Sequence, residues 1–133
     1  MKTIKLVIAD DHELCRNFFK ELLRKYDDID VVSCVSDGIE FIEYVKTNQN
    51  IDIVLLDISM PNMNGFEVLD QIKDLNPSVK PIIISMHDEG NYIAKCAKKG
   101  AYSYLLKNTD QEELIQVIRK VKQGKKYFRR TAK

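Results

Sequence analysis

The sequence predicts a single doubly wound α/β domain, in which a parallel sheet is covered by helices on both faces. Strand-like and helix-like segments alternate five times along the 133 residues. The strand-like segments are mostly apolar, although Asp30 and Ser33 interrupt the second, and this is typical of strands buried on both faces. Right-handed crossovers join such strands. The length suits one domain, and we assign residues 1–124 to that domain and residues 125–133 to a basic linker or tail.

The elements follow from hydrophobic periodicity. The expected strands are residues 4–9, 29–35, 51–56, 81–85 and 101–106. The expected helices carry apolar residues at spacings of three and four, and they are residues 12–26, 38–47, 65–75, 90–99 and 110–123. In the first helix we expect the inward stripe to be Leu14, Phe18, Leu22 and Leu23.

Composition excludes several classes of protein. No uncharged apolar run approaches the roughly 18 residues that a membrane span needs, and the N-terminus lacks the features of a signal peptide. We therefore expect a cytoplasmic protein with no membrane partner. Cys15, Cys34 and Cys96 are scattered and form no CxxC pair, so their spacing suggests neither a zinc site nor a redox pair. We expect reduced thiols that pack as small hydrophobic residues.

The net charge of +1 hides an uneven distribution. Residues 119–133 carry eight Lys or Arg and no acid, whereas the preceding 118 residues carry 13 basic and 20 acidic side chains. An acidic body suits a cation site. The basic end suits contact with nucleic acid or an acidic partner, but cations also favour a helix C-terminus, and no nucleic-acid motif is present.

Polar side chains occupy the carboxyl ends of four expected strands. Asp10 and Asp11 follow the first, Asp57 the third, Ser85 ends the fourth and Lys107 follows the fifth. Each has an ordinary explanation, because acids cap helices, Asp and Ser form turns and lysine is common at strand ends. In doubly wound sheets, however, functional sites lie at the carboxyl ends. Their joint placement favours one shared site.

The residue types suggest phosphoryl chemistry. Carboxylates are ligands for Mg²⁺, which takes one or two of them together with water and phosphate oxygens. A carboxylate such as Asp57 can also attack phosphorus and form an acyl phosphate. Lys107 would hold a phosphoryl oxygen by its charge, and the Ser85 hydroxyl could donate a hydrogen bond to one.

These residues carry a family resemblance. The chain resembles the receiver domains of bacterial two-component response regulators over roughly residues 3–123. The resemblance rests on Asp10-Asp11, on residues 55–61 (Leu-Leu-Asp-Ile-Ser-Met-Pro) with Gly65, on Ile84-Ser85 and on residues 105–107 (Leu-Leu-Lys). It implies a flavodoxin-like (βα)5 fold with five strands in the order 2-1-3-4-5.

The resemblance also implies roles for individual residues. Asp57 would be the phosphoacceptor, assisted by Lys107. The metal, Mg²⁺ or Mn²⁺, would be held by Asp10, Asp11, Asp57 and the backbone carbonyl of Ser59, with Asp10 acting through water.

Further roles concern switching and the lifetime of the phosphoryl group. Ser85 would be the catalytic and switch hydroxyl, and Tyr104 the aromatic switch residue. Ser59 and His87, two residues beyond Asp57 and Ser85, would flank the path of hydrolytic water and tune dephosphorylation. Residues 90–99, 101–106 and 110–123 would form the face that repacks.

Residues 84–88, 105–108 and 112–127 resemble the subfamily whose receivers precede a LuxR-type helix-turn-helix domain. The implied partners are a sensor histidine kinase and, through the receiver surface, a second copy of the chain. Transcription control through DNA would need an output domain that these 133 residues do not contain, and we expect residues 125–133 to begin the linker to it. Asn108 departs from many receivers, in which a proline follows the lysine.

Three alternatives remain open. An aspartyl-phosphate hydrolase would place its nucleophile after the first strand with a second acid two residues on, which Asp10-Asp11-His12 does not match. A nucleotide or flavin binder would need phosphate-binding loops, and neither GxGxxG nor a P-loop is present. A degenerate receiver would act only as a docking module, although the acidic and switch positions are all filled. We expect no enzyme beyond the chain's own phosphorylation and dephosphorylation.

Overall fold

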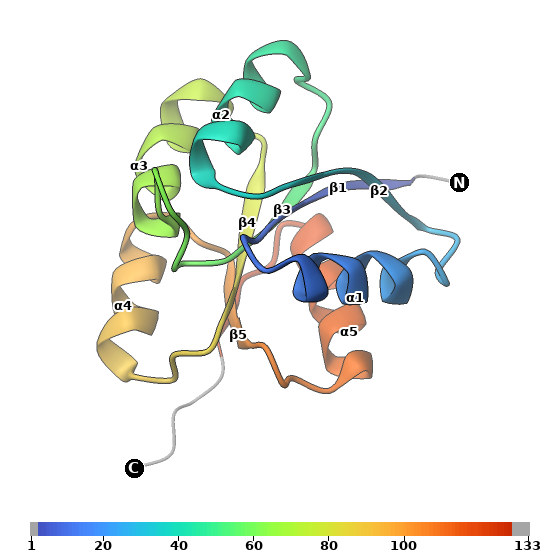
Figure 1. Cartoon of the computed structure of the whole chain (residues 1–133). Coiled ribbons are helices and arrows are strands. Elements are labelled where there is room, and N and C mark those ends of the chain that lie inside the picture. The colour runs from blue at the N-terminus through green and yellow to red at the C-terminus, as the bar shows by residue number, and fades with distance from the viewer. Residues whose placement is uncertain (1–2, 129–133) are drawn as a thin grey trace.

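The computed structural model describes residues 3–128 as one parallel sheet between two layers of helices (Figure 1). The strands are β1 (Ile4–Ala9), β2 (Ile29–Val35), β3 (Ile53–Leu56), β4 (Lys80–Ser85), β5 (Ser103–Leu106) and β6 (Tyr127–Phe128). Their order is β2-β1-β3-β4-β5-β6, and every neighbouring pair is parallel. The predicted order of the first five strands is confirmed.

The prediction of a five-stranded sheet was wrong, because a short sixth strand pairs with β5. Gly124, at a φ of 91°, ends the last helix and lets the chain turn back towards the sheet. The Tyr127 amide then donates to the Tyr102 carbonyl (2.9 Å), and Ser103 Oγ donates to the Tyr127 carbonyl (2.6 Å). Part of the predicted linker therefore belongs to the sheet, and residues 129–133 lie outside the described residues.

Five helices flank the sheet: α1 (Glu13–Leu23), α2 (Gly38–Thr47), α3 (Gly65–Leu75), α4 (Gly90–Lys98) and α5 (Gln111–Lys122). Figure 1 shows α1 and α5 on one face and α2, α3 and α4 on the other. Several predicted bounds agree with the structure, and the remaining ends differ by one to three residues. Among the described residues no helix is long and apolar enough to cross a membrane.

Two apolar cores lie on opposite faces of the sheet. Within β1, Val7 and Ala9 pack in the core beneath α2, α3 and α4, whereas Leu6 and Ile8 pack in the core beneath α1 and α5. Successive side chains of a strand point to opposite faces, so a strand buried on both faces is apolar at most positions. This explains the apolar runs of the sequence.

The predicted inward stripe of α1 was wrong in part. Leu22 and Leu23 are buried, but Leu14 is 85% exposed and Phe18 is 58% exposed. The buried stripe is instead Phe19, Leu22 and Leu23, which are spaced by three and four residues and face the sheet.

Candidate functional site

The carboxyl ends of β1, β3 and β5 bring two acids and one lysine into contact. Lys107 Nζ lies 3.0 Å from Asp10 Oδ2 and 3.4 Å from Asp57 Oδ2. These residues are distant in sequence, and they meet because parallel strands end at the same edge of the sheet. The predicted convergence of Asp10, Asp57 and Lys107 is confirmed.

All three charged groups are buried. Asp10 is 2% exposed, Asp57 is 4% exposed and the Lys107 side chain is 8% exposed. Burial and then the charge of Asp10 raise the pKa of Asp57 to about 6, against the opposing effect of Lys107. Burial lowers the pKa of Lys107, but the hydrogen bond to Asp10 and the charges of both acids outweigh it, so that its pKa is raised. The site therefore carries more negative charge than its lysine balances.

Asp11 and His12 extend this cluster towards solvent. Ligand atoms of Asp10, Asp11, His12 and Asp57 all lie within 4.8 Å of one another. His12 Nδ1 lies 3.3 Å from Asp10 Oδ1 and 3.2 Å from Asp11 Oδ1. The three predicted acidic ligands are thus brought together. An oxygen-rich donor set with excess negative charge fits a hard divalent cation such as Mg²⁺.

The loop after Asp57 has a fixed shape. The Gly65 amide donates to the Ile58 carbonyl (2.8 Å), and a Cβ at position 65 would lie 2.5 Å from the Asp57 carbonyl oxygen. Only glycine allows this close approach. The backbone of Ser59 opposes the rise in the pKa of Asp57, although burial and the charge of Asp10 outweigh it. The role of the Ser59 carbonyl as a ligand stays a prediction.

Three side chains fix the start of α3 and the loop that precedes it. Asn64 accepts a hydrogen bond from the Glu67 amide (3.0 Å), and Glu67 accepts one from the Asn64 amide (2.9 Å), which is a capping box at the start of α3. Asn62 adopts a φ of 68° and donates to Asp37 Oδ2 (2.7 Å). Asn tolerates this left-handed conformation better than most residues.

Ser85 and Tyr104 hold the same backbone residue. Ser85 Oγ, which is fully buried, accepts the His87 amide (3.0 Å), and Tyr104 Oη donates to the His87 carbonyl (2.6 Å). Tyr104 is 3% exposed, and burial raises its pKa to about 12. Within the described chain no hydrogen bond joins the Ser85 hydroxyl to Asp57. Both predicted switch residues therefore fix the β4–α4 loop rather than contact the acids.

Sequence reasoning missed two neighbours of the site on α1. Arg16 Nη1 donates to the Asp10 carbonyl (2.8 Å), and Cys15 Sγ lies 3.8 Å from Lys107 Nζ. Helical periodicity could have found them, because positions three and four after His12 return to the same side of a helix. The peptide bond between Lys107 and Asn108 is trans, and so are all other peptide bonds of the described residues.

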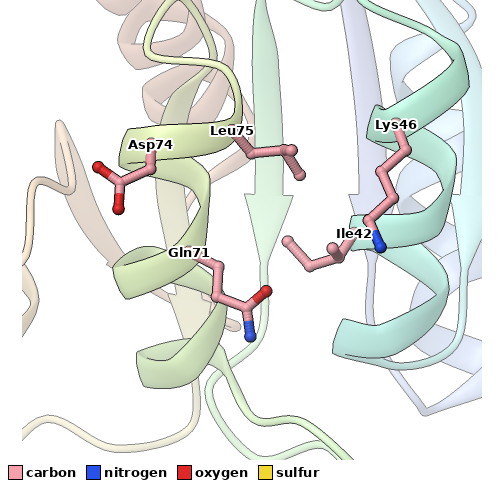
Figure 2. Close-up of a pocket in the computed structure, with 5 residues that line it drawn as sticks. All are labelled: Ile42, Lys46, Gln71, Asp74 and Leu75. Atoms are coloured by element: carbon pink, nitrogen blue, oxygen red, sulfur yellow. The ribbon is translucent and has the colours of Figure 1, made fainter.

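A groove of about 300 Å³ lies between α2 and α3 and is separate from this cluster (Figure 2). Its lining residues are Ile42, Lys46, Gln71, Asp74 and Leu75. They come mostly from the C-terminal halves of α2 and α3. Because these helices run antiparallel to the strands, the groove lies towards the amino ends of the strands, away from the acidic cluster. Only one of its lining residues, Asp74, is an acid, and the acidic cluster remains the candidate site.

Comparison with known proteins identifies the family of the chain. Residues 6–119 match the response regulator receiver domain family. The transcriptional regulatory protein DegU of Brevibacillus brevis is 38% identical over 125 residues, which cover 94% of this chain and 52% of DegU. The chain thus spans about half the length of that curated relative.

Solved structures agree as well. The signal receiver domain of NarL from Mycobacterium tuberculosis superposes with a TM-score of 0.88 at 27% identity, covering 94% of this chain and all of that one. A DNA-binding response regulator of the LuxR family from Staphylococcus aureus gives a TM-score of 0.83 at 29% identity, covering 90% of this chain and 98% of that one. The chain therefore belongs to the response regulator receiver domain family.

Proposed function

We propose that this chain is a phosphorylation-activated switch that accepts a phosphoryl group on Asp57 from a sensor histidine kinase. The observation that carries the proposal is the buried cluster of Asp57, Asp10 and Lys107. An acid with a pKa of about 6 is ionised at neutral pH and available as a nucleophile. Its lysine partner is already within 3.4 Å, where it can neutralise the charge of an incoming phosphoryl group.

The transfer uses the phosphohistidine of the kinase, a proton from solvent and a divalent metal ion. An oxygen of Asp57 attacks the phosphorus, the new O–P bond forms as the P–N bond to the kinase histidine breaks, and the departing imidazole nitrogen takes a proton from solvent. Lys107 holds a phosphoryl oxygen while Asp10 keeps the lysine in place (3.0 Å). Mg²⁺ or Mn²⁺, held by Asp10, Asp11, Asp57 and the Ser59 carbonyl, would offset the negative charge of the phosphoryl oxygens.

The signal would leave the site through the β4–α4 loop. If Ser85 Oγ turns towards the phosphoryl group, it releases the His87 amide that it now holds. Tyr104 then loses its fixed acceptor, the His87 carbonyl, and turns inward. The face formed by α4, β5 and α5 repacks as a two-state element biased by local charge.

The output that we propose is transcription control through a DNA-binding domain outside these residues, as the similarity to DegU and to LuxR-family regulators suggests. A homodimer through the receiver surface would serve that output. The chain would process no separate substrate and would catalyse only its own phosphorylation and dephosphorylation.

The test is phosphorylation by a small phosphodonor with Mg²⁺, followed by gel shift or intact mass. The wild-type chain should gain one phosphoryl group, and Asp57→Asn should gain none. Asp52→Asn is the matched control, because Asp52 precedes β3 at the opposite edge of the sheet. Labelling that survives in Asp57→Asn contradicts the assignment. Repeated turnover of the donor at a rate far above that of the phosphoprotein's own hydrolysis would favour the hydrolase alternative.

The lifetime of the phosphoryl group provides a second test. Exchanging Ser59 or His87 should change the dephosphorylation rate, because both lie beside the proposed path of water. Unchanged rates in both single variants would remove this role.

A further inference from the structure

We propose that Asp10, His12 and Cys15 form a second metal site, which takes Zn²⁺ or a divalent ion of similar softness. One ligand atom from each residue lies within 4.8 Å of the other two. A carboxylate oxygen, an imidazole nitrogen and a thiolate sulfur are the three kinds of ligand that bind zinc in proteins. The site differs from the acidic cluster in its sulfur ligand, which Mg²⁺ does not use.

The turn from β1 into α1 brings the three residues together. Asp10 Oδ1 accepts the His12 amide (2.9 Å), which fixes the turn, and the same oxygen lies 3.3 Å from His12 Nδ1. His12 is the N-cap of α1, but its side chain makes no capping hydrogen bond. Cys15 follows three residues later, on the same side of the first helical turn.

The two oxygens of Asp10 face different partners. Oδ2 lies 3.0 Å from Lys107 Nζ, whereas Oδ1 faces His12. Asp10 can therefore bind a metal through Oδ1 and keep its ion pair with Lys107 through Oδ2. The His12 side chain is 61% exposed and Cys15 is half-buried, so that an ion can enter from solvent.

Lys107 sets a limit on affinity. Its ammonium lies 3.8 Å from Cys15 Sγ and repels a divalent ion placed there. The carboxylate and the thiolate offset this repulsion, and the thiol proton leaves to solvent when the sulfur binds metal. With three protein ligands, the site keeps a coordination position for water and is weaker than a closed four-ligand site.

The two sites share Asp10, so that their metals compete. A zinc ion on Asp10 and His12 would remove one acid from the proposed Mg²⁺ set and would add charge beside Lys107. Zinc would then inhibit the phosphorylation of Asp57. This consequence, unlike the binding itself, rests on the proposed function.

Co²⁺ is the probe for binding, because a thiolate bound to Co²⁺ gives a charge-transfer band in the near ultraviolet. The reduced 1–133 chain should develop this band on titration with Co²⁺ and lose it when Zn²⁺ is added. Cys15→Ser should abolish the band, and His12→Gln should weaken the apparent affinity by about tenfold or more. Cys34→Ser is the matched control, since Cys34 is also half-buried but lies on β2, and it should keep the band. No band in the wild-type chain, or a band retained in Cys15→Ser, overturns the proposal.

Phosphorylation with Mg²⁺ and a small phosphodonor tests the competition. Added Zn²⁺ should slow labelling of the wild-type chain, with much less effect on Cys15→Ser. Equal inhibition of both would show that zinc inhibits without the Cys15 sulfur and would contradict competition through this site. If neither protein is labelled without Zn²⁺, the proposed function fails, while the cobalt band still decides whether the site exists.

Discussion

Replacing Asp57 by Asn should stabilise the metal-free protein at neutral pH, although Asp57 is the centre of the proposed function. Burial, and next the charge of Asp10, raise its pKa from 3.8 to about 6. Each pKa unit corresponds to about 1.4 kcal/mol, so the ionised carboxylate costs at most about 3 kcal/mol of folding free energy. This shift already includes the opposing effect of Lys107, which keeps its ion pair with Asp10 (3.0 Å) in the variant, and we expect a net gain of about 1–3 kcal/mol in the free energy of unfolding.

The pH dependence follows from the sign of this shift. Below about pH 4 the carboxyl is protonated in the folded and the unfolded chain, and it costs nothing. Between about pH 4 and pH 6 the unfolded chain ionises first, so the folded wild-type chain loses stability as the pH rises. Above about pH 6 the penalty is complete, and the advantage of Asp57→Asn should be largest there.

Urea unfolding in the presence of EDTA measures this advantage at about pH 7.5 and about pH 5. Asp52→Asn is the matched control with the opposite sign. Burial raises the pKa of Asp52, but the hydrogen bond from the Lys5 amide (2.8 Å) and the ion pair with Lys122 (3.0 Å) outweigh it, and the pKa is lowered. That variant should be destabilised at neutral pH. An Asp57→Asn variant that is no more stable than wild type at about pH 7.5, or whose gain does not shrink at about pH 5, would refute the reasoning.

Three other substitutions test the frame around the site. Gly65→Ala would place a Cβ 2.5 Å from the Asp57 carbonyl oxygen. In urea unfolding it should lower the free energy of unfolding by about 1–3 kcal/mol, and it should slow phosphorylation because the loop after Asp57 must shift. Asn64→Ala removes the capping box of α3 and should cost about 1 kcal/mol without changing the phosphorylation rate, which separates stability from site geometry. Tyr104→Phe leaves the His87 carbonyl without its hydrogen-bond donor, which now lies at 2.6 Å, and should lower the free energy of unfolding by about 1–3 kcal/mol. The His87 amide should also exchange its hydrogen faster. Unchanged exchange would contradict a role for the tyrosine in holding this loop.

The five main strands could be predicted because their burial on both faces leaves a local signal, an apolar run such as Ile53–Leu56. The sixth strand could not. It has two residues, and its pairing depends on the turn at Gly124 and on the hydrogen bond from Ser103 to Tyr127. No periodicity can be read from two residues.

The candidate site could be predicted for the same reason as the sheet. Once the strands are parallel, the residues after β1, β3 and β5 must meet, and Asp10, Asp57 and Lys107 do. What could not be predicted is how deeply they are buried, since that depends on packing around the whole edge. The contact of Cys15 with Lys107 also depends on the angle at which α1 leaves the sheet.

The site of phosphorylation itself is the most direct test of the proposed function. After treatment with a small phosphodonor and Mg²⁺, borohydride reduces an aspartyl phosphate to homoserine, which peptide sequencing by mass spectrometry locates. The account predicts homoserine at position 57, and its absence when the donor or the metal is left out. Homoserine at position 10 or 11 instead, or none at any position of a labelled chain, would contradict it.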